Sequence, residues 1–252
     1  MRFKDKVAIV TGGGRDIGRE VSLKLASEGA RVVVNFANDE ASANETVERI
    51  RAAGGEAIVH RADVGSPEGA AGLLAATIEA YGDKIDVLVN LAGGMVQRRP
   101  LGEQDDAFYD TVMNLNLRSA YLMTRLTVPH MPAGSAIVNF SSQAGRDGGG
   151  PGASLYATAK GAIMTFTRSM AKELGPQGIR VNALCPGMIA TKFHDTFSKD
   201  EVRKMVAGNT PLRREGNAPE VAATVAFLAS DMASYMSGAA LLVDGGAFAN
   251  FQ

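Results

Sequence analysis

The stretch Val7-Ala-Ile-Val-Thr-Gly-Gly-Gly-Arg-Asp-Ile-Gly18 decides the fold of this chain. It begins with a short apolar run, 7–10, that is typical of a buried strand, and passes through three glycines into a helix-length segment at 17–28. A glycine-rich turn between a strand and a helix brings backbone N–H groups and a helix N-terminus up to phosphate groups. The turn lacks the Gly-Lys-Ser/Thr of a P-loop and the usual G-x-G-x-x-G spacing. A purely structural turn is therefore the alternative to a dinucleotide site.

The same pairing of an apolar run with a helix-length segment repeats along the chain. Six further β-branched runs lie at 30–34, 56–59, 85–89, 136–140, 179–183 and 240–243, and the helix-length segments lie at 40–53, 67–81, 105–128, 153–175 and 218–229. Four of the predicted helices end at glycines expected to be C-caps: Gly29, Gly54, Gly82 and Gly175. This alternation predicts an α/β fold, a doubly wound (Rossmann) parallel seven-stranded sheet with helices on both faces, formed by residues 1–252 as a single domain.

One polar segment, at about 188–216, interrupts the alternation between the sixth strand and the last helix. In a doubly wound sheet the ligand crevice lies outside the carboxyl ends of the strands. An insertion that follows a strand is therefore placed to cover that crevice. We expect this segment to be a lid over the substrate, with an ordered surface loop as the alternative.

The composition excludes several classes of function. With a net charge of -1 and no long charged run, a nucleic-acid or anionic-membrane surface is not expected. No apolar run is long enough to cross a membrane, and the sole cysteine, Cys185, favours a reducing compartment. The histidines His60, His130 and His194 are scattered, so no metal site is predicted. We expect a cytoplasmic protein.

Tyr156 and Lys160 are four residues apart in Tyr-Ala-Thr-Ala-Lys, inside a predicted helix. This spacing puts both side chains on one helical face. A tyrosine ordinarily ionises near pH about 10, and a nearby ammonium favours the phenolate. The pair is therefore a candidate acid/base, although a solvated helix face would show the same spacing.

Several motifs in order point to one family. Thr11-Gly-Gly-Gly-Arg-Asp-Ile-Gly18, Asn90-Leu-Ala-Gly93, Pro186-Gly-Met-Ile-Ala-Thr191 and Val243-Asp-Gly-Gly246 accompany the tyrosine–lysine pair. Together they resemble the short-chain dehydrogenase/reductase family in its single-domain form, over essentially the whole chain. The resemblance implies an NAD(P)-dependent oxidoreductase acting on a ketone or secondary alcohol.

The resemblance also implies the site residues. The catalytic group would be Asn116, Ser142, Tyr156 and Lys160, with Asn114 and Ser141 as rival registers for the asparagine and the serine. Lys160 would lower the pKa of Tyr156, and Asn116 would hold a water that relays protons. The residues implied to contact the cofactor are Gly12, Gly14, Arg15, Asp16, Ile17, Gly18, Asn35, Phe36, Asp63, Val64, Asn90, Ala92, Gly93, Tyr156, Lys160, Pro186, Gly187, Ile189 and Thr191.

One departure from the family pattern bears on the cofactor. Asp16 stands where the family has a glycine, which puts the turn geometry in question. Arg15, and the lack of an acid at Asn35 and Phe36, favour NADP(H). Asp16 itself, with Asp39 downstream, adds negative charge that opposes a 2′-phosphate. The choice between NADP(H) and NAD(H) is therefore nearly even.

The substrate is the least determined part of the site. Gln143, Arg146, Met188 and His194 are the candidate substrate contacts, and Arg98, Arg99 and Arg146 are the cations available for an anionic substrate. The loop 142–151 with 193–197 resembles family members that reduce sugar-derived ketones, including keto-deoxy uronates. The alternatives are a 3-oxoacyl-thioester reductase, a glucose-type sugar dehydrogenase and a non-catalytic dinucleotide-binding sensor. The family also implies a homotetramer, and the apolar content of 153–175 is consistent with a second buried face.

Overall fold

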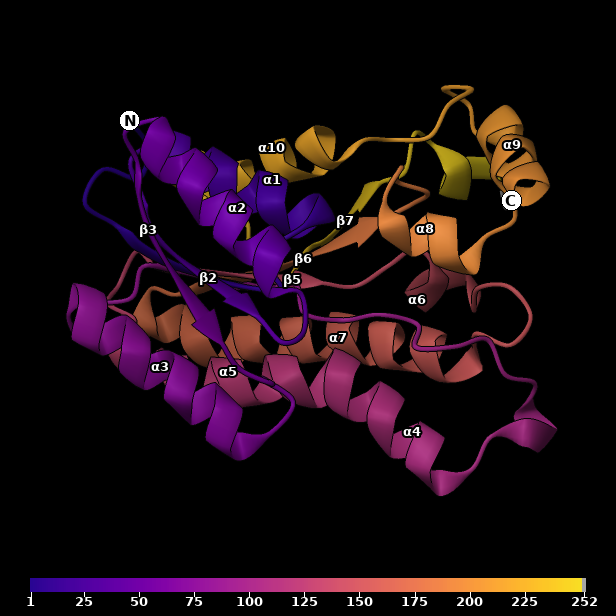
Figure 1. The fold of residues 1–252 in the computed structure, drawn as a ribbon, viewed down its shortest axis with the longest axis horizontal. Coiled ribbons are helices and arrows are strands. Elements are labelled where there is room, and N and C mark those ends of the chain that lie inside the picture. Colours follow the sequence, from indigo (N-terminus) through magenta and orange to yellow (C-terminus); the bar gives the residue numbers. More distant parts are fainter. Residues whose placement is uncertain (251–252) are drawn as a thin grey trace.

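The computed structural model describes residues 1–250 and contains one parallel sheet with helices on both faces (Figure 1). The strand order is β3-β2-β1-β4-β5-β6-β7, and every pair of neighbours is parallel. The strands are β1 (Val7–Thr11), β2 (Arg31–Phe36), β3 (Glu56–Arg61), β4 (Val87–Asn90), β5 (Ala136–Phe140), β6 (Arg180–Pro186) and β7 (Ala240–Val243). All seven predicted strands and the predicted fold class are confirmed.

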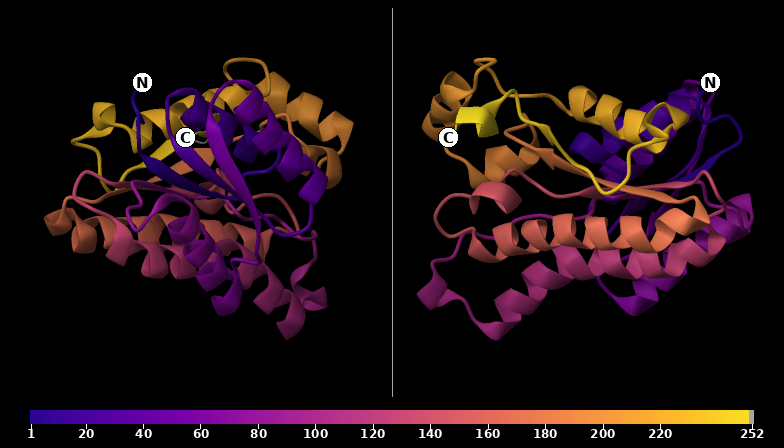
Figure 2. Two further views of the ribbon diagram at one scale, coloured as in Figure 1. Left: turned by 60° about the vertical axis from the view of Figure 1, so that its left-hand side comes forward. Right: turned by 180° about the vertical axis from the view of Figure 1, so that it is seen from behind.

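Two helical layers enclose the sheet. On one face lie α1 (Asp16–Ser27), α2 (Glu40–Ala52) and α10 (Ala218–Ala229), and on the other lie α3 (Pro67–Tyr81), α4 (Asp106–Met113), α5 (Ser119–Thr127) and α7 (Ser154–Leu174). The view from behind in Figure 2 shows the same two layers. The strands have nearly continuous apolar sequences because helices cover both faces of the sheet.

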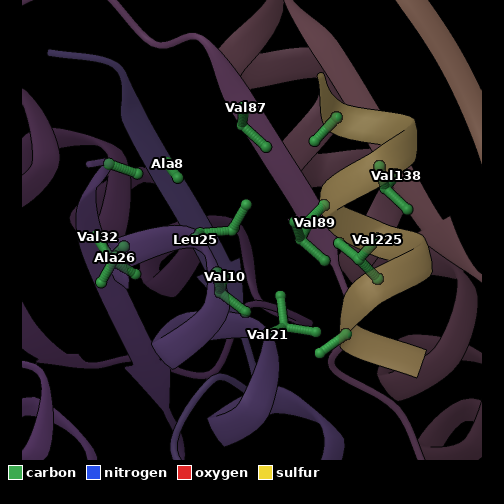
Figure 3. Packing of buried hydrophobic residues seen from close by; sticks show 14 of the residues in the cluster. Ala8, Val10, Val21, Leu25, Ala26, Val32, Val87, Val89, Val138 and Val225 are labelled. Atoms are coloured by element: carbon green, nitrogen blue, oxygen red, sulfur yellow. The ribbon is translucent and has the colours of Figure 1, made fainter. Parts of the chain in front are cut away.

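Each layer has its own hydrophobic core. Val21 and Leu25 of α1 and Val225 of α10 pack with alternate residues of the central strands, such as Val10 and Val89, on one face (Figure 3). On the other face the packed residues include Ile9, Leu73, Leu88, Met123 and Ile137. The alternation of side chains along a strand thus divides the apolar runs between two cores.

The predicted helix at 105–128 is not continuous. A π-helical turn, Asn114–Arg118, separates α4 from α5. The side-chain amide of Asn116 donates to the carbonyl of Val112, four residues earlier, at 2.9 Å. A side chain that bonds to the i−4 carbonyl competes with the backbone N–H, which accounts for the local change of helix type.

Gly175 is the C-cap residue of α7, as predicted, but its conformation differs from that of the other three predicted caps. Gly29, Gly54 and Gly82 have positive φ as expected, but Gly175 has φ −53° and continues from α7 into a 3₁₀ turn. The left-handed glycine is Gly178, with φ +76°. A Cβ there would also lie 2.9 Å from the Cβ of Ala133, so the close approach of the loop before β5 adds a second reason for glycine.

The strand order reverses between β1 and β4, and the short helices collect at that edge of the sheet. They are α6 (Ala144–Asp147), α8 (Lys192–Phe197) and α9 (Asp200–Asn209), at the right-hand end in Figure 1. The strand β6 runs three residues beyond the prediction, to Pro186, and carries the chain out to this edge. The carboxyl ends of the strands are therefore where a ligand crevice is expected.

Candidate active site

The glycine-rich turn is held in place through its carbonyl groups and two of its N–H groups. The side-chain oxygen of Asn35 accepts from the N–H of Gly12 at 3.2 Å, and its backbone carbonyl accepts from the N–H of Gly13 at 2.9 Å. The hydroxyl of Ser22 donates to the carbonyl of Gly13 at 3.1 Å, and that of Thr46 donates to the next glycine at 2.8 Å. No side chain of residues 1–250 caps α1, so the N–H groups of its first turn are left for an anionic ligand.

Asp16 adopts the backbone conformation that favours glycine. Its φ is +50°, so the turn keeps its path although a side chain is present. One carboxylate oxygen accepts a hydrogen bond from the N–H of Lys192, the first residue of α8, at 3.3 Å. The guanidinium of Arg15 lies 3.9 Å from the other oxygen and is more than half exposed. The departure from the family pattern thus adds a contact to the 188–216 segment.

A cavity of about 790 Å³ follows the carboxyl edge of the sheet from the glycine-rich turn to the catalytic pair. Its size is in the range of small-molecule and cofactor sites. The predicted residues that line it are Gly12, Gly14, Arg15, Asp16, Ile17, Gly18, Asn35, Phe36, Asp63, Val64, Ala92, Gly93, Ser142, Gln143, Tyr156, Lys160, Pro186, Gly187, Met188, Ile189, Thr191 and His194. The uncapped helix and this long cleft fit a dinucleotide, with the pyrophosphate at α1.

Three predicted site residues lie outside the cavity lining. The side chain of Asn90 is buried and donates to Thr124 and to Asn139, at 3.1 and 2.9 Å. Arg146 donates to the carbonyl of Ala240 at 2.5 Å, and its guanidinium lies over the ring of Phe248. Asn116 is fully buried. The structure therefore does not bring the side chains of Asn90 and Arg146 to the site.

Asn116 clamps the loop after β4. Its side chain donates to the carbonyl of Gly94 at 2.8 Å and accepts from the N–H of the same residue at 2.9 Å. A Cβ on Gly93 would lie 2.9 Å from the Oδ1 of Asn116 and 2.8 Å from the Nζ of Lys160. Asn116 and Lys160 thus approach each other across a position that only glycine can occupy. The water relay implied by the family resemblance stays a prediction.

Ser142 and Tyr156 face each other at the cavity wall. Burial raises the pKa of the Tyr156 phenol, and a side-chain hydrogen bond with Ser142 opposes that rise. The rival serine, Ser141, is buried and donates its hydroxyl to the carbonyl of Lys160 at 2.6 Å. Of the two hydroxyls, only that of Ser142 is directed at the phenol.

Lys160 is buried and donates its ammonium to the carbonyl of Phe140 at 2.8 Å. Burial lowers the pKa of Lys160 to about 8. The ammonium lies 5.8 Å from the centroid of the Tyr156 ring. Burial sets the direction in which the pKa of Tyr156 shifts, and the opposing contribution comes from Ser142. The expectation that Lys160 lowers the pKa of Tyr156 stays a prediction. Both pKa values are therefore set mainly by desolvation.

The predicted lid segment forms two helices that line the cavity. Phe193 of α8 lies 6.0 Å from Tyr156 between ring centroids, and Val202 and Val206 of α9 line the same cavity. His194 shares a hydrogen bond with Ser198 at 3.0 Å, and burial lowers its pKa. The sequence analysis placed the segment 193–197 at the substrate end without naming Phe193 as a contact, and it missed the two valines. Their spacing, 193 to 197 and 202 to 206, was the available sign of two short amphipathic helices.

Residues 1–250 include neither a candidate metal site nor a helix suited to span a membrane. Within this range no cluster of three or more His, Cys, Asp or Glu side chains is arranged to hold a metal ion. None of the helices described has the length and apolar character to span a membrane.

Known proteins resemble the chain over nearly its full length. A family model described as Enoyl-(Acyl carrier protein) reductase matches residues 12–247. Versicolorin reductase 1 of Aspergillus parasiticus is 39% identical, with 98% of each chain covered. The 3-oxoacyl-[acyl-carrier-protein] reductase FabG of Staphylococcus aureus is 36% identical over 96% of this chain and 98% of its own.

Solved structures agree with this relationship. A short chain dehydrogenase from Burkholderia cenocepacia in complex with NADP superposes with a TM-score of 0.92 at 31% identity, covering 98% of this chain and 100% of that one. An NADH-dependent reductase A1-R′ responsible for alginate metabolism gives a TM-score of 0.89 at 35% identity, with 97% and 98% covered. The chain therefore belongs to the short-chain dehydrogenase/reductase family and is an NAD(P)-dependent oxidoreductase.

Proposed function

We propose that this enzyme reduces a ketone to a secondary alcohol, with Tyr156 as the general acid. The observation that carries the proposal is the hydrogen-bonded pair of Ser142 and Tyr156 on the cavity wall, beside the buried ammonium of Lys160. A nicotinamide cofactor supplies the hydride when bound. Ser142 donates a hydrogen bond to the carbonyl oxygen, and Tyr156 delivers the proton as negative charge develops there.

The pKa directions suit reduction. Because burial raises the pKa of Tyr156, the phenol stays protonated at neutral pH and is available as an acid. Lys160, with a pKa of about 8, can give up a proton close to neutrality. It is thus able to restore the proton that Tyr156 loses.

The substrate that the cavity fits best is a ketone with an apolar, ring-bearing body. Phe193 lies beside Tyr156, and Met188, Val202 and Val206 also line the cavity. Arg98 also lines the cavity, but its Nε and one N–H of its Nη1 donate to the carbonyls of Phe197 and Pro151. The pKa of His194 is lowered, so its imidazole is neutral at pH 7. The 39% identity with versicolorin reductase 1 supports a reductive reaction.

A keto-deoxy uronate is the second candidate, and the alginate-metabolism neighbour supports it. Of the three cations that the sequence offered for its carboxylate, Arg146 donates to the carbonyl of Ala240 in β7, and Arg99 lies 3.8 Å from the carboxylate of Asp105. Arg98, which lines the cavity and keeps N–H groups beyond its two carbonyl bonds, is the cation left for that carboxylate. A 3-oxoacyl thioester is supported by the resemblance to FabG. Gln143, which lines the cavity, is a further polar contact for either substrate.

For the cofactor we propose that NADPH and NADH are both accepted. The pocket beyond Phe36 contains Asp39, whose carboxylate accepts from the N–H of Ser42 at 3.1 Å. That bond holds the pKa of Asp39 below its usual value, so the group stays charged. The positive charges of Lys192 and Arg15 act on it from nearby. Opposite charges near the adenosine ribose leave little net preference for a 2′-phosphate.

We further propose a cytoplasmic homotetramer. Tyr121 and Leu101, on the α4–α5 side, are large and exposed. Within the monomer Phe166 of α7 packs edge-on against Tyr121, at 6.4 Å between centroids. Part of the apolar surplus of α7 is thus covered by its neighbour, and the rest is available for an interface. Sedimentation analysis of the purified protein measures the oligomeric state.

The test of the proposed function is turnover of a ketone panel with NADPH and NADH in parallel. The panel includes a fused-ring aromatic ketone, a 3-oxoacyl thioester, a keto-deoxy uronate and an aliphatic ketone of similar size. We expect the highest kcat/KM for the aromatic ketone, and a ratio between the two cofactors below about tenfold, which corresponds to less than about 1.4 kcal/mol. A clear preference for the uronate would replace the first candidate by the second, and no turnover of any ketone would refute the proposal.

A further inference from the structure

The short helix α8 is held at both ends by charged side chains from other loops. At its start the carboxylate of Asp16 accepts from the N–H of Lys192 at 3.3 Å. At its end the Nε of Arg98 donates to the carbonyl of Phe197, the last residue of the helix, at 3.2 Å. We infer that Asp16 and Arg98 are positioning residues, which hold α8 closed over the cavity and so determine how tightly substrate is retained.

Both contacts fill needs of the helix itself. The first N–H groups and the last carbonyls of a helix have no partner within it. In the described part of the chain, the N-cap residue Thr191 gives α8 no side-chain cap. The signs of the two charges also match the polarity of a helix, negative at the N–H end and positive at the carbonyl end. Asp16 and Arg98 therefore replace the caps that the segment does not provide locally.

Arg98 ties α8 to a second wall of the cavity. Its Nη1 donates to the carbonyl of Pro151, in the loop before α7, at 3.0 Å. The loop that carries Arg98 is bent at Val96, which has φ +63° although it is β-branched, and the N–H of Gln97 donates to the carbonyl of Met95 at 2.7 Å. Such strain persists where the surroundings determine the backbone. The guanidinium is thus presented from a fixed loop.

The position of α8 matters because of what it carries. Phe193 lies beside Tyr156, and His194 and Thr191 line the cavity with it. Asp16 belongs to the turn whose neighbouring N–H groups are placed for the pyrophosphate. One residue therefore connects the cofactor end of the site to the cover over the substrate. A glycine at this position, as in the family pattern, has no side chain to make that connection.

Two substitutions at position 16 separate this role from the effect of charge. Asp16→Gly and Asp16→Asn both accept a φ of +50°, and both remove the negative charge beside the pyrophosphate. Only asparagine keeps an oxygen that can accept from Lys192. Any effect of charge, on cofactor affinity or on the end of α8, is therefore common to both variants, whereas loss of the hydrogen bond to Lys192 is confined to Asp16→Gly.

The experiment measures hydrogen exchange of peptides covering 191–198 in the enzyme without substrate or cofactor. We expect Asp16→Gly to raise exchange about fivefold, the equivalent of about 1 kcal/mol, and Asp16→Asn to stay within about twofold of wild type. The KM for the ketone should rise in the same pattern. This exchange does not depend on which substrate the enzyme uses, so it can fail or succeed independently of the proposed function.

Substitutions of Arg98 provide an independent test of the inference. Arg98→Met, which keeps the length and loses the donors, should also raise exchange about fivefold, while Arg98→Lys is expected to recover part of the loss. The two sites act on one closing equilibrium, so the double variant Asp16→Gly/Arg98→Met should show about 25-fold faster exchange. Equal exchange in Asp16→Gly and Asp16→Asn, or unchanged exchange in Arg98→Met, would overturn the inference. If a position-16 variant does not fold, the Arg98 pair decides alone.

Discussion

Gly93 lies where the buried side chains of Lys160 and Asn116 approach each other, and Gly93→Ala tests that arrangement. The added Cβ would lie 2.8 Å from the Nζ of Lys160 and 2.9 Å from the Oδ1 of Asn116. Real Cβ atoms essentially never approach other atoms so closely, so one side chain must move. Lys160 has the longer, more flexible side chain, and its movement breaks the 2.8 Å hydrogen bond to the carbonyl of Phe140.

The size of the effect follows from that bond. A hydrogen bond made by a charged group contributes about 1.5–3 kcal/mol, so loss of this geometry in the transition state should lower kcat about 10- to 150-fold. The assay is steady-state ketone reduction, with the affinity for NADPH measured separately by fluorescence. We expect that affinity to change less than kcat, since the glycine-rich turn is untouched.

Gly94→Ala is the matched control. A Cβ there would meet only the side chain of Leu115, at 3.8 Å, which is ordinary van der Waals contact. Neither glycine has a positive φ, so alanine suits both backbones. Wild-type kcat in Gly93→Ala, or an equal loss in Gly94→Ala, would refute the role given to the position beside Lys160.

Three further predictions concern the chemistry and the stability of the site. Tyr156→Phe should abolish ketone reduction in a turnover assay and leave NADPH binding within about threefold by titration, because the phenol is the proton donor and burial of the ring is kept; appreciable turnover would exclude Tyr156 as the acid. Lys160→Met should inactivate the enzyme and yet raise its free energy of unfolding at pH 7 by about 1–2 kcal/mol, because the buried ammonium, with its pKa lowered to about 8, destabilises the fold below that pH. Because deprotonation removes this penalty, the free energy of unfolding of the wild type should rise as the pH increases from about 8 towards 10.5, the pKa in the unfolded chain. Urea unfolding should therefore give free energies for wild type and variant that converge over this pH range. A difference that widens with pH would contradict the prediction. Val96→Gly should raise stability by about 1 kcal/mol in the same measurement, since glycine relieves the positive φ, and a loss would show that Val96 is not strained.

The sequence predicted the strands well because each is an apolar run bounded by a turn, and such runs are unambiguous when both faces of a sheet are covered. It did not predict the break at Asn114–Arg118, since the signal is a single side-chain bond from Asn116 to Val112 that no periodicity records. For a similar reason it did not show that the left-handed glycine after α7 is Gly178 and not the C-cap residue Gly175. The approach of Ala133 to Gly178 joins residues far apart in the chain.

The site was predicted unevenly. Residues that follow strands, such as Asp63 and Pro186, line the cavity because topology alone brings the carboxyl ends together. Side-chain direction was not predictable: Asn90 and Arg146 occupy suitable places in the sequence, but bond to Asn139 and Ala240 instead. The spacing of Tyr156 and Lys160 indicates a nearby charge but not the burial that raises the pKa of Tyr156, because burial depends on distant segments such as the one that carries Phe193.

The carboxamide of Asn35 has a consequence for how this enzyme can change its cofactor. It bonds to the N–H of Gly12 and, through its amide, to the carbonyl of Ala62 at 3.0 Å, and so locks the glycine-rich turn to the neighbouring strands. An acid at position 35 that binds the ribose hydroxyls could not keep both of these hydrogen bonds, so this substitution is not expected to be tolerated. A change of cofactor preference, by evolution or by engineering, therefore requires substitutions at positions 36–39, whose side chains do not hold the glycine-rich turn in place.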